Sequence, residues 1–349
     1  MLTRIVEPVA RIGAMVALVA MLATLTLAQA VAQDSTPAAS AYAPPANAGE
    51  LEGEIVSDGS STVGPLTIAA AENFNEFAPN VENNVTISGT GGGFERFCLG
   101  ETDLQNASRA ISEDEVALCA ENEVDFFEFE VAFDGITIVV PESNTFLTCI
   151  STDALAQIWN GEIENYNEIS PEYPDMEITL FGPGSESGTY DFFNEEILGE
   201  DEAGETFEPS ASYEPSEDDN TLVEGVAGTE GGLGHFGYSY YTEAQDRLNA
   251  VAVTADGDLN NCVAPDPETI RTGTYAPLSR PLYVYVKASS LAENPALQEF
   301  LRYYVADASA IATSIGFVDA PAEDIAASVE KLEGAIAGTT PPDSQAAGS

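Results

Sequence analysis

The sequence predicts an α/β fold with mainly parallel sheets, and three observations support this prediction. Strand-like apolar runs alternate with helix-like segments between residues 50 and 334. One run, Ile136–Val140, is continuous and β-branched, as is typical of a strand buried inside a sheet. Three loops rich in Ser, Thr and Gly each follow an apolar run and precede a helix-like segment. Such loops lie beyond the carboxyl ends of strands, where α/β sheets bind their ligands.

The elements expected in the first part of the chain follow in order. The strands are Glu54–Ser57, which leads into a Ser-rich turn, Val85–Ser88, Asp125–Val131 and Gly135–Pro141. The helices are Pro65–Phe77 and, after a Gly-rich turn, Phe94–Leu99.

The second part continues the alternation. The expected helices are Thr152–Trp159, with Thr152 as a candidate cap, Tyr190–Leu198 and Pro295–Val305, and the expected strands are Glu177–Phe181 and Leu282–Val286. The acidic segment Glu200–Asp219 lacks periodicity and is expected to form a surface loop. The segment Asp256–Asn261 faintly resembles a calcium loop but lacks its downstream ligand pattern, so we expect a solvated turn.

The ends of the chain indicate export. Arg4 and Arg11 flank the start of an apolar run, Ile12–Leu27, and a small-residue pattern ending at Ala32 offers a cleavage site. We therefore expect a cleavable signal peptide over residues 1–32 and a periplasmic or extracellular protein; an uncleaved anchor is the alternative. No lipobox cysteine follows the run, since the first Cys is Cys98. Residues 33–49 and 335–349 are expected to be a disordered spacer and a disordered tail.

Charge limits the possible partners. The chain has 59 acidic and 10 basic residues and a formal net charge of −49. This excess argues strongly against nucleic acid as a partner. It also repels small anions. In about 1 M salt, however, the screening length falls to about 3 Å, so distant carboxylates are screened while direct hydrogen bonds remain. A saline habitat or simple solubility would each explain the acidity.

Four cysteines in an exported chain favour disulfides, and three pairings are possible. Cys98 and Cys119 bracket a compact segment, so we favour Cys98–Cys119 with Cys149–Cys262 over free thiols. No C-x-x-C motif or Cys/His cluster supports a metal site.

The three loops share one chemistry. They are Gly59-Ser60-Ser61-Thr62, Ser88-Gly89-Thr90-Gly91-Gly92-Gly93 and Ser185-Glu186-Ser187-Gly188-Thr189. Hydroxyls and free backbone N–H groups at a helix N-terminus suit a tetrahedral oxyanion. Each loop alone could equally be a simple helix cap. Together they favour a protein that holds an anion.

Catalytic motifs are absent from the sequence. There is no G-x-S-x-G and no G-x-x-x-x-G-K-[ST], and the lysines are Lys287 and Lys331 alone. The single histidine, His235, lies in an aromatic, Gly-rich segment, where a structural role is favoured over a catalytic base. We expect neither an enzyme nor a cofactor.

Several ordered motifs carry a family resemblance. They include Ser57-Asp58-Gly59-Ser60-Ser61-Thr62-Val63-Gly64-Pro65, Gly89-Thr90-Gly91-Gly92-Gly93-Phe94, Asn106-Ala107-Ser108-Arg109-Ala110-Ile111 and Gly182-Pro183-Gly184-Ser185-Glu186-Ser187-Gly188-Thr189. Weaker matches are Ile158-Trp159-Asn160-Gly161-Glu162-Ile163, Leu233-Gly234-His235-Phe236-Gly237-Tyr238 and Leu278-Ser279-Arg280-Pro281-Leu282. By these motifs the chain resembles the phosphate-binding proteins of Pst-type ABC importers, which are type II periplasmic solute-binding proteins.

The resemblance implies two α/β domains joined by a hinge, with a ligand cleft between them. Domain I would comprise residues 50–135 and 280–334, and domain II residues 136–279. The implied phosphate ligands are Ser61, Thr62, Thr90, Ser187, Gly188 and Thr189. The implied partners are inorganic phosphate and the permease subunits of an importer, and we expect a monomer.

Two positions depart from the best-known branch of that family. Arg109 aligns with an Asp that accepts the proton of hydrogen phosphate there, and Pro183 replaces an Arg. Arg109 is therefore expected to donate two N–H groups to phosphate. Asp134 and Glu186 are the candidate proton acceptors. Two alternatives stay open: the same scaffold binding sulfate or molybdate, and a surface adhesion or signalling protein that reuses the fold.

Overall fold

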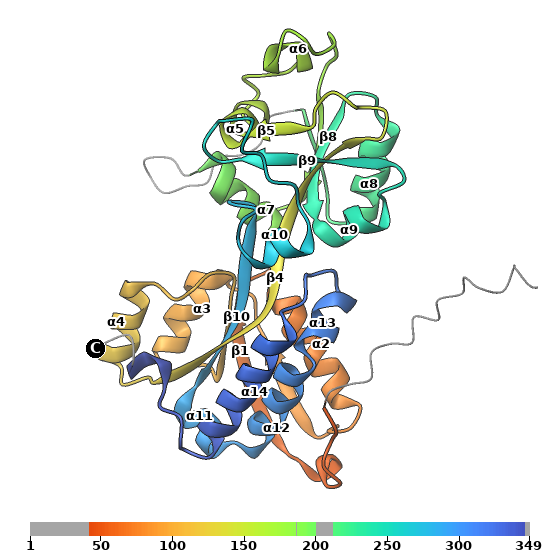
Figure 1. Ribbon diagram of the computed structural model, residues 1–349. Helices are drawn as coiled ribbons and strands as arrows, with labels where there is room; N and C mark the ends of the chain where they lie inside the picture. Colours follow the sequence, from red (N-terminus) through yellow and green to blue (C-terminus); the bar gives the residue numbers. More distant parts are fainter. Residues whose placement is uncertain (1–41, 186, 200–211, 346–349) are drawn as a thin grey trace, which may run out of the picture. The chain divides into compact units, whose positions relative to one another are not determined.

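The computed structural model of the protein describes residues 42–185, 187–199 and 212–345 (Figure 1). The strands are β1 (Gly53–Gly59), β2 (Val81–Val85), β3 (Leu104–Ala107), β4 (Phe126–Pro141), β5 (Cys149–Ser151), β6 (Thr179–Pro183), β7 (Tyr213–Ser216), β8 (Gly232–Gly237), β9 (Leu248–Thr254) and β10 (Ser279–Lys287). The signal sequence expected over residues 1–32 and most of the expected loop Glu200–Asp219 lie outside the described residues; the end of that loop is strand β7 and the start of a helix.

Helices connect most of these strands. They are α2 (Gly64–Asn75), α3 (Gly89–Cys98), α4 (Glu113–Glu121), α5 (Thr152–Trp159), α6 (Tyr166–Ile169), α7 (Gly188–Phe193), α8 (Asp219–Gly228), α9 (Tyr238–Glu243), α10 (Pro267–Arg271), α11 (Ala288–Glu293), α12 (Pro295–Ala306), α13 (Ala308–Ser314) and α14 (Ala322–Ile336). Three single turns complete the set: η1 (Ala48–Glu50), the π-helical η2 (Asn194–Leu198) and η3 (Asp343–Gln345).

The strands form a mixed sheet, so the α/β prediction is confirmed while the parallel content is lower than expected. The order is β2-β1-β3-β10-β4-β8-β6-β7, with β9 paired to both β4 and β5. The pairs β1–β2, β1–β3, β6–β7, β6–β8 and β5–β9 are parallel. Each antiparallel pair includes one or both of the long strands β4 and β10.

Strand β4 serves two separate hydrophobic cores. Its first residues, including Phe129 and Val131, pack in one core, whereas Ile136 and Ile138 pack in the other. The two strands expected at Asp125–Val131 and Gly135–Pro141 are therefore one continuous strand. The intervening residues stay in it because they pair antiparallel with β10 as far as Gly135.

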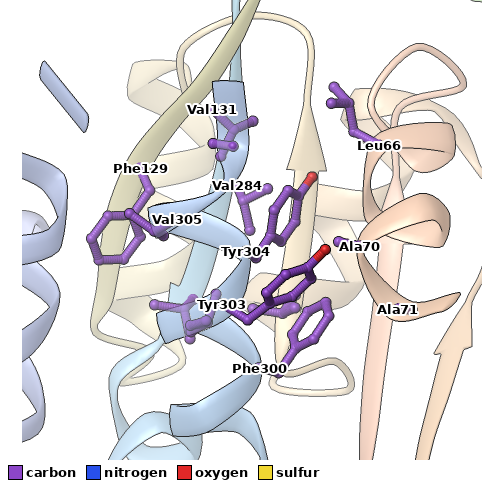
Figure 2. Packing of buried hydrophobic residues seen from close by; sticks show 14 of the residues in the cluster. Leu66, Ala70, Ala71, Phe129, Val131, Val284, Phe300, Tyr303, Tyr304 and Val305 are labelled. Atoms are coloured by element: carbon purple, nitrogen blue, oxygen red, sulfur yellow. The ribbon is translucent and has the colours of Figure 1, made fainter. Parts of the chain in front are cut away.

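The first core lies between β1, β4 and β10 and the helices α2, α12, α13 and α14 (Figure 1). Figure 2 shows Phe300, Tyr303 and Tyr304 of α12 directed toward Ala70 and Ala71 of α2. The small side chains of α2 allow α12 to approach closely, and burying these rings is the main stabilising contribution. This core supports the loop that precedes α2.

The second core supports the loop that precedes α7. Trp159 of α5 packs against Phe193 of α7, with ring centroids 4.9 Å apart, and both side chains are buried. His235 of β8 stacks on Phe193 at 3.8 Å and also contacts Trp159, with ring centroids 5.4 Å apart. Helix α5 is capped by Ser151, whose hydroxyl accepts from Ala154 N, so the expected cap Thr152 is wrong by one residue.

Disulfides join Cys98 to Cys119 and Cys149 to Cys262, as the sequence favoured. The first links α3 to α4. The second links β5 to the segment before α10. The first therefore fixes the carboxyl end of the helix that begins with the second predicted ligand loop.

Ordered contacts extend into both the segment expected as a spacer, residues 33–49, and the segment expected as a tail, residues 335–349. Tyr42 packs against Phe77 and Tyr303, and its hydroxyl donates to Glu299. At the other end, α14 continues to Ile336. The carboxylate of Asp343 accepts from Glu128 N (2.7 Å). Composition indicated disorder at both places because it does not register such tertiary contacts.

Candidate functional site

The first loop, Ser60–Val63, connects β1 to α2. The Ser60 hydroxyl accepts from the backbone N–H of Thr62 (3.1 Å) and of Val63 (3.4 Å), so Ser60 is the residue that orders the turn. The side chains of Ser61 and Thr62 are thereby left for other partners. Ser61 Oγ donates to Asp191 Oδ2 (3.4 Å), and Thr62 Oγ1 accepts from Arg280.

The second loop is itself the start of a helix. Helix α3 begins at Gly89, five residues before Phe94, where the helix was expected to begin. Gly93 is required there, because a Cβ at this position would lie 2.2 Å from Gln105 Oε1 and 2.5 Å from Gly59 Cα. The Thr90 hydroxyl contacts Ser108 Oγ at 3.0 Å, which joins the second loop to the end of β3.

The third loop follows β6 and leads into α7, whose cap is Ser187; its hydroxyl accepts from Thr189 N (3.2 Å). Gly188 lies directly against the first loop. A Cβ on Gly188 would stand 2.1 Å from Thr62 Oγ1 and 2.8 Å from Ser61 Oγ. Only glycine allows these two loops to approach so closely.

A cavity of about 1150 Å³ opens between the three loops. Of the predicted ligands, its lining includes Ser61, Thr62, Thr90, Arg109 and Gly188. Ser187, the cap of α7, and Thr189 are the chain neighbours of Gly188, and neither belongs to the described lining. Its volume slightly exceeds the range of roughly 300–1,000 Å³ that is typical of small-molecule pockets, so the cleft has ample room for a small anion.

Arg109 lies at the edge of this cleft with 49 % of its side chain exposed. Its two terminal nitrogens donate to the two oxygens of Glu115, each at 2.8 Å. Glu115 also completes the capping box of α4 with Ser112. Arg109 is thus held by an acidic partner from its own side of the cleft.

Arg280 is a candidate site residue that sequence reasoning missed. It lines the cleft from β10 with 11 % of its side chain exposed. Nη2 donates to Thr62 Oγ1 (2.8 Å) and to the Gly188 carbonyl (3.1 Å), and therefore contacts the first and third loops together. The motif Leu278–Leu282 pointed to this segment, but the role of Arg280 depends on strand pairing, which the motif does not reveal.

Carboxylates from the opposite side face these cations. Asp191 of α7 and Glu195 and Glu196 of η2 all line the cleft. Burial raises the pKa of Asp191, while the hydrogen bond from Ser61 and the charge of Arg280 act against that rise. Burial and the charge of Glu195 likewise raise the pKa of Glu196. The site therefore combines oxyanion donors with acceptors that could receive a proton.

Of the two proton acceptors proposed from the sequence, Asp134 and Glu186, the structure describes only Asp134. Asp134 is 2 % exposed and pairs with Arg280, and it is not part of the described cleft lining. Burial raises the pKa of Asp134, and the positive charge of Arg280 opposes that rise. Glu186 lies outside the described residues.

Among the residues that the structure describes, we find no evidence for an acid–base histidine or for a metal site. Burial lowers the pKa of His235 to about 3, so the ring is neutral and packs among aromatic side chains. In the same residues, no cluster of three or more His, Cys, Asp or Glu side chains could hold a metal ion. Nor does any helix within residues 42–185, 187–199 and 212–345 have the length and apolar character needed to span a membrane.

Comparison with known proteins gives a consistent result. A family model described as a PBP superfamily domain matches residues 32–308. The chain is 41 % identical to protein SphX of a Synechocystis strain over 77 % of this chain and 79 % of that protein. It is 36 % identical to the phosphate-binding protein PstS of Staphylococcus saprophyticus over 83 % of this chain and 88 % of that protein.

Comparison with solved structures gives the same result. The chain is similar to a possible phosphate-binding protein from Planctomyces limnophilus, with 36 % identity, a TM-score of 0.74, and coverage of 82 % of this chain and 99 % of that one. An ABC-type phosphate transport receptor from Vibrio cholerae matches at a TM-score of 0.59, with 22 % identity over 77 % of this chain and 100 % of that one. The second match supports the fold alone.

Proposed function

Because the chain belongs to the PBP superfamily, and within it to the Pst-type phosphate-binding proteins, we propose that it captures inorganic phosphate and delivers it to an ABC importer. The observation that carries this proposal is the cleft in which three Ser/Thr/Gly loops meet around buried Arg280. Hydroxyl groups, the N-termini of α2 and α3 and an arginine together suit a tetrahedral oxyanion.

The proposed ligand set follows the loops. Ser61 and Thr62 of the first loop, Thr90 of the second, and Ser187, Gly188 and Thr189 of the third would donate to phosphate, with Arg109 adding charge from the edge. Ser61 and Thr62 already lie against Gly188, and this close approach supports an anion held between the first and third loops. The bound anion would replace contacts that the loops now make with each other.

We infer that the two hydrophobic cores move as two domains, residues 50–135 with 280–334 and residues 136–279. Strands β4 and β10 pass between these cores and would form the hinge. Opening would separate α7 from α2, because Gly188 already lies against the first loop. The exported location, with a cleaved segment 1–32, is also part of this proposal, as are a monomeric state and the absence of catalysis.

Calorimetry on ligand-stripped protein tests the proposal. Phosphate should bind and should raise the melting temperature, because ligand at about 100 times its dissociation constant adds roughly 2.7 kcal/mol to stability. Sulfate and molybdate at equal concentration are the matched comparisons and should shift the melting temperature much less. Equal shifts for phosphate and sulfate would favour a general oxyanion binder, and no shift with any of these anions would contradict a binding role in this cleft.

A further inference from the structure

We propose that Arg280, rather than a residue of the three loops, supplies the principal positive charge that binds the oxyanion. This inference rests on the proposed function and deepens it, because it assigns the charged ligand of the same cleft. The inference is based on the position of the largely buried Arg280 guanidinium relative to the two sides of the cleft. The sequence had assigned this charge to Arg109.

The pairing of β10 with β4 places Arg280 in the wall of the cleft. Arg280 of β10 is in register with Asp134 of β4, at the part of both strands that lies between the two hydrophobic cores. Its Nε and Nη2 donate to Asp134 Oδ2 at 3.4 and 3.3 Å. The guanidinium also lies 3.7 Å from the centroid of the Phe192 ring. These contacts hold the planar group in one orientation.

That orientation leaves donor capacity for a ligand. Nε and Nη2 are engaged, while Nη1 has no hydrogen-bond partner among the described residues. Because Nη2 reaches both Thr62 and Gly188, an anion that joins the first and third loops would meet the guanidinium directly. Arg109 differs, because both of its terminal nitrogens already serve Glu115.

A purely structural role explains the placement less well. A buried ion pair seldom stabilises a fold more than well-packed apolar side chains would, because both charges lose their hydration. Here the pair stands at a cavity wall, with Asp134 2 % and Arg280 11 % exposed. The more exposed partner faces the cavity. Asp134 therefore serves as the internal counterion that keeps the cation in place before the ligand arrives.

The test compares four variants of the full chain by calorimetry with inorganic phosphate and by thermal melting. Arg280→Gln should weaken phosphate binding at least 30-fold, equivalent to about 2 kcal/mol. Arg280→Lys should recover part of the loss, because an ammonium group cannot reproduce the planar fork. Arg247→Gln is the matched control: Arg247 pairs with Glu224 outside the described cleft lining, so its loss should leave affinity unchanged.

The double variant Arg280→Gln/Asp134→Asn guards against misfolding, since removing both charges leaves no unpaired buried ion. It should melt cooperatively and still bind phosphate at least 30-fold more weakly than the parent. If this variant is folded and binds phosphate like the parent, Arg280 is structural and the inference is overturned. If the parent itself gives no heat with phosphate, it is the proposed function that fails.

Discussion

At the scale of single residues, Asp191 combines three properties that suit discrimination between anions. It lines the cleft, it accepts a hydrogen bond from Ser61, and burial raises its pKa. Hydrogen phosphate carries a proton that it can donate to a carboxylate, whereas fully ionised sulfate has none. Asp191 accepts one hydrogen bond, from Ser61, and only a protonated anion would add a further donor to this carboxylate, so Asp191 should favour hydrogen phosphate.

Replacing Asp191 with Asn should therefore narrow the preference for phosphate over sulfate. We expect phosphate binding to weaken and sulfate binding to strengthen, so that the ratio of the two affinities falls by at least tenfold, about 1.4 kcal/mol. Parallel calorimetric titrations with the two anions measure this ratio. Glu217→Gln, in a residue outside the described cleft lining, serves as the comparison. An unchanged ratio in Asp191→Asn would assign selectivity to another group.

Residue types in the sequence indicated the loops and Arg109 but not Arg280 or Asp191. Ser61, Thr62, Thr90 and Gly188 belong to local motifs, so their place beside the cleft followed from short-range patterns. Arg280 and Asp191 reach the cleft through strand pairing and through the approach of α7 to the first loop. Such long-range contacts leave no periodic signal along the chain.

At the scale of secondary-structure elements, the approach of α7 to α2 depends on one glycine. Gly188 begins α7 and lies against Ser61 and Thr62, where a Cβ would overlap both side chains. Gly188→Ala should therefore push the first and third loops apart and weaken phosphate binding at least tenfold, about 1.4 kcal/mol. Calorimetry provides the affinity, and thermal melting shows whether the fold itself is intact.

Gly228→Ala is the matched control, because Gly228 is the last residue of α8 and a Cβ there would meet nothing within 4 Å. This control should bind phosphate like the parent. Parental affinity in Gly188→Ala would mean that anion binding does not depend on the close approach of α7 to the first loop.

Most elements with strong local patterns were predicted to within a few residues, such as α12 and β10. The strand expected at Val85–Ser88 was displaced, because β2 is Val81–Val85 and Ile87 is exposed. Polar residues in β2 hid an edge strand that pairs only with β1. Strand β8 is Gly-rich and gave no strand signal, since its glycines serve close packing against Phe181 and Val226.

At the scale of the whole molecule, the acidic charge and the anion site oppose each other. The net charge of −49 creates a field that repels phosphate from a distance. The cleft counters this field at short range with Arg280, Arg109 and the loop donors. Contact interactions of this kind survive salt far better than repulsion between remote carboxylates.

Salt should therefore stabilise the ligand-free protein. Raising NaCl from about 0.05 M to about 1 M shortens the screening length to about 3 Å and removes most of the repulsion among surface carboxylates. We expect the melting temperature to rise by about 5 °C or more, which corresponds to one or two kcal/mol for a domain of this size class. Sorbitol at equal osmolarity separates screening from general solute exclusion and should give a smaller rise.

The same titrations with phosphate should show affinity maintained at high salt, because the ligand bonds are direct while the opposing field is screened. A melting temperature that stays flat or falls with NaCl would mean that the carboxylates are already neutralised within the fold, and the acidity would then reflect local pairing rather than a long-range field.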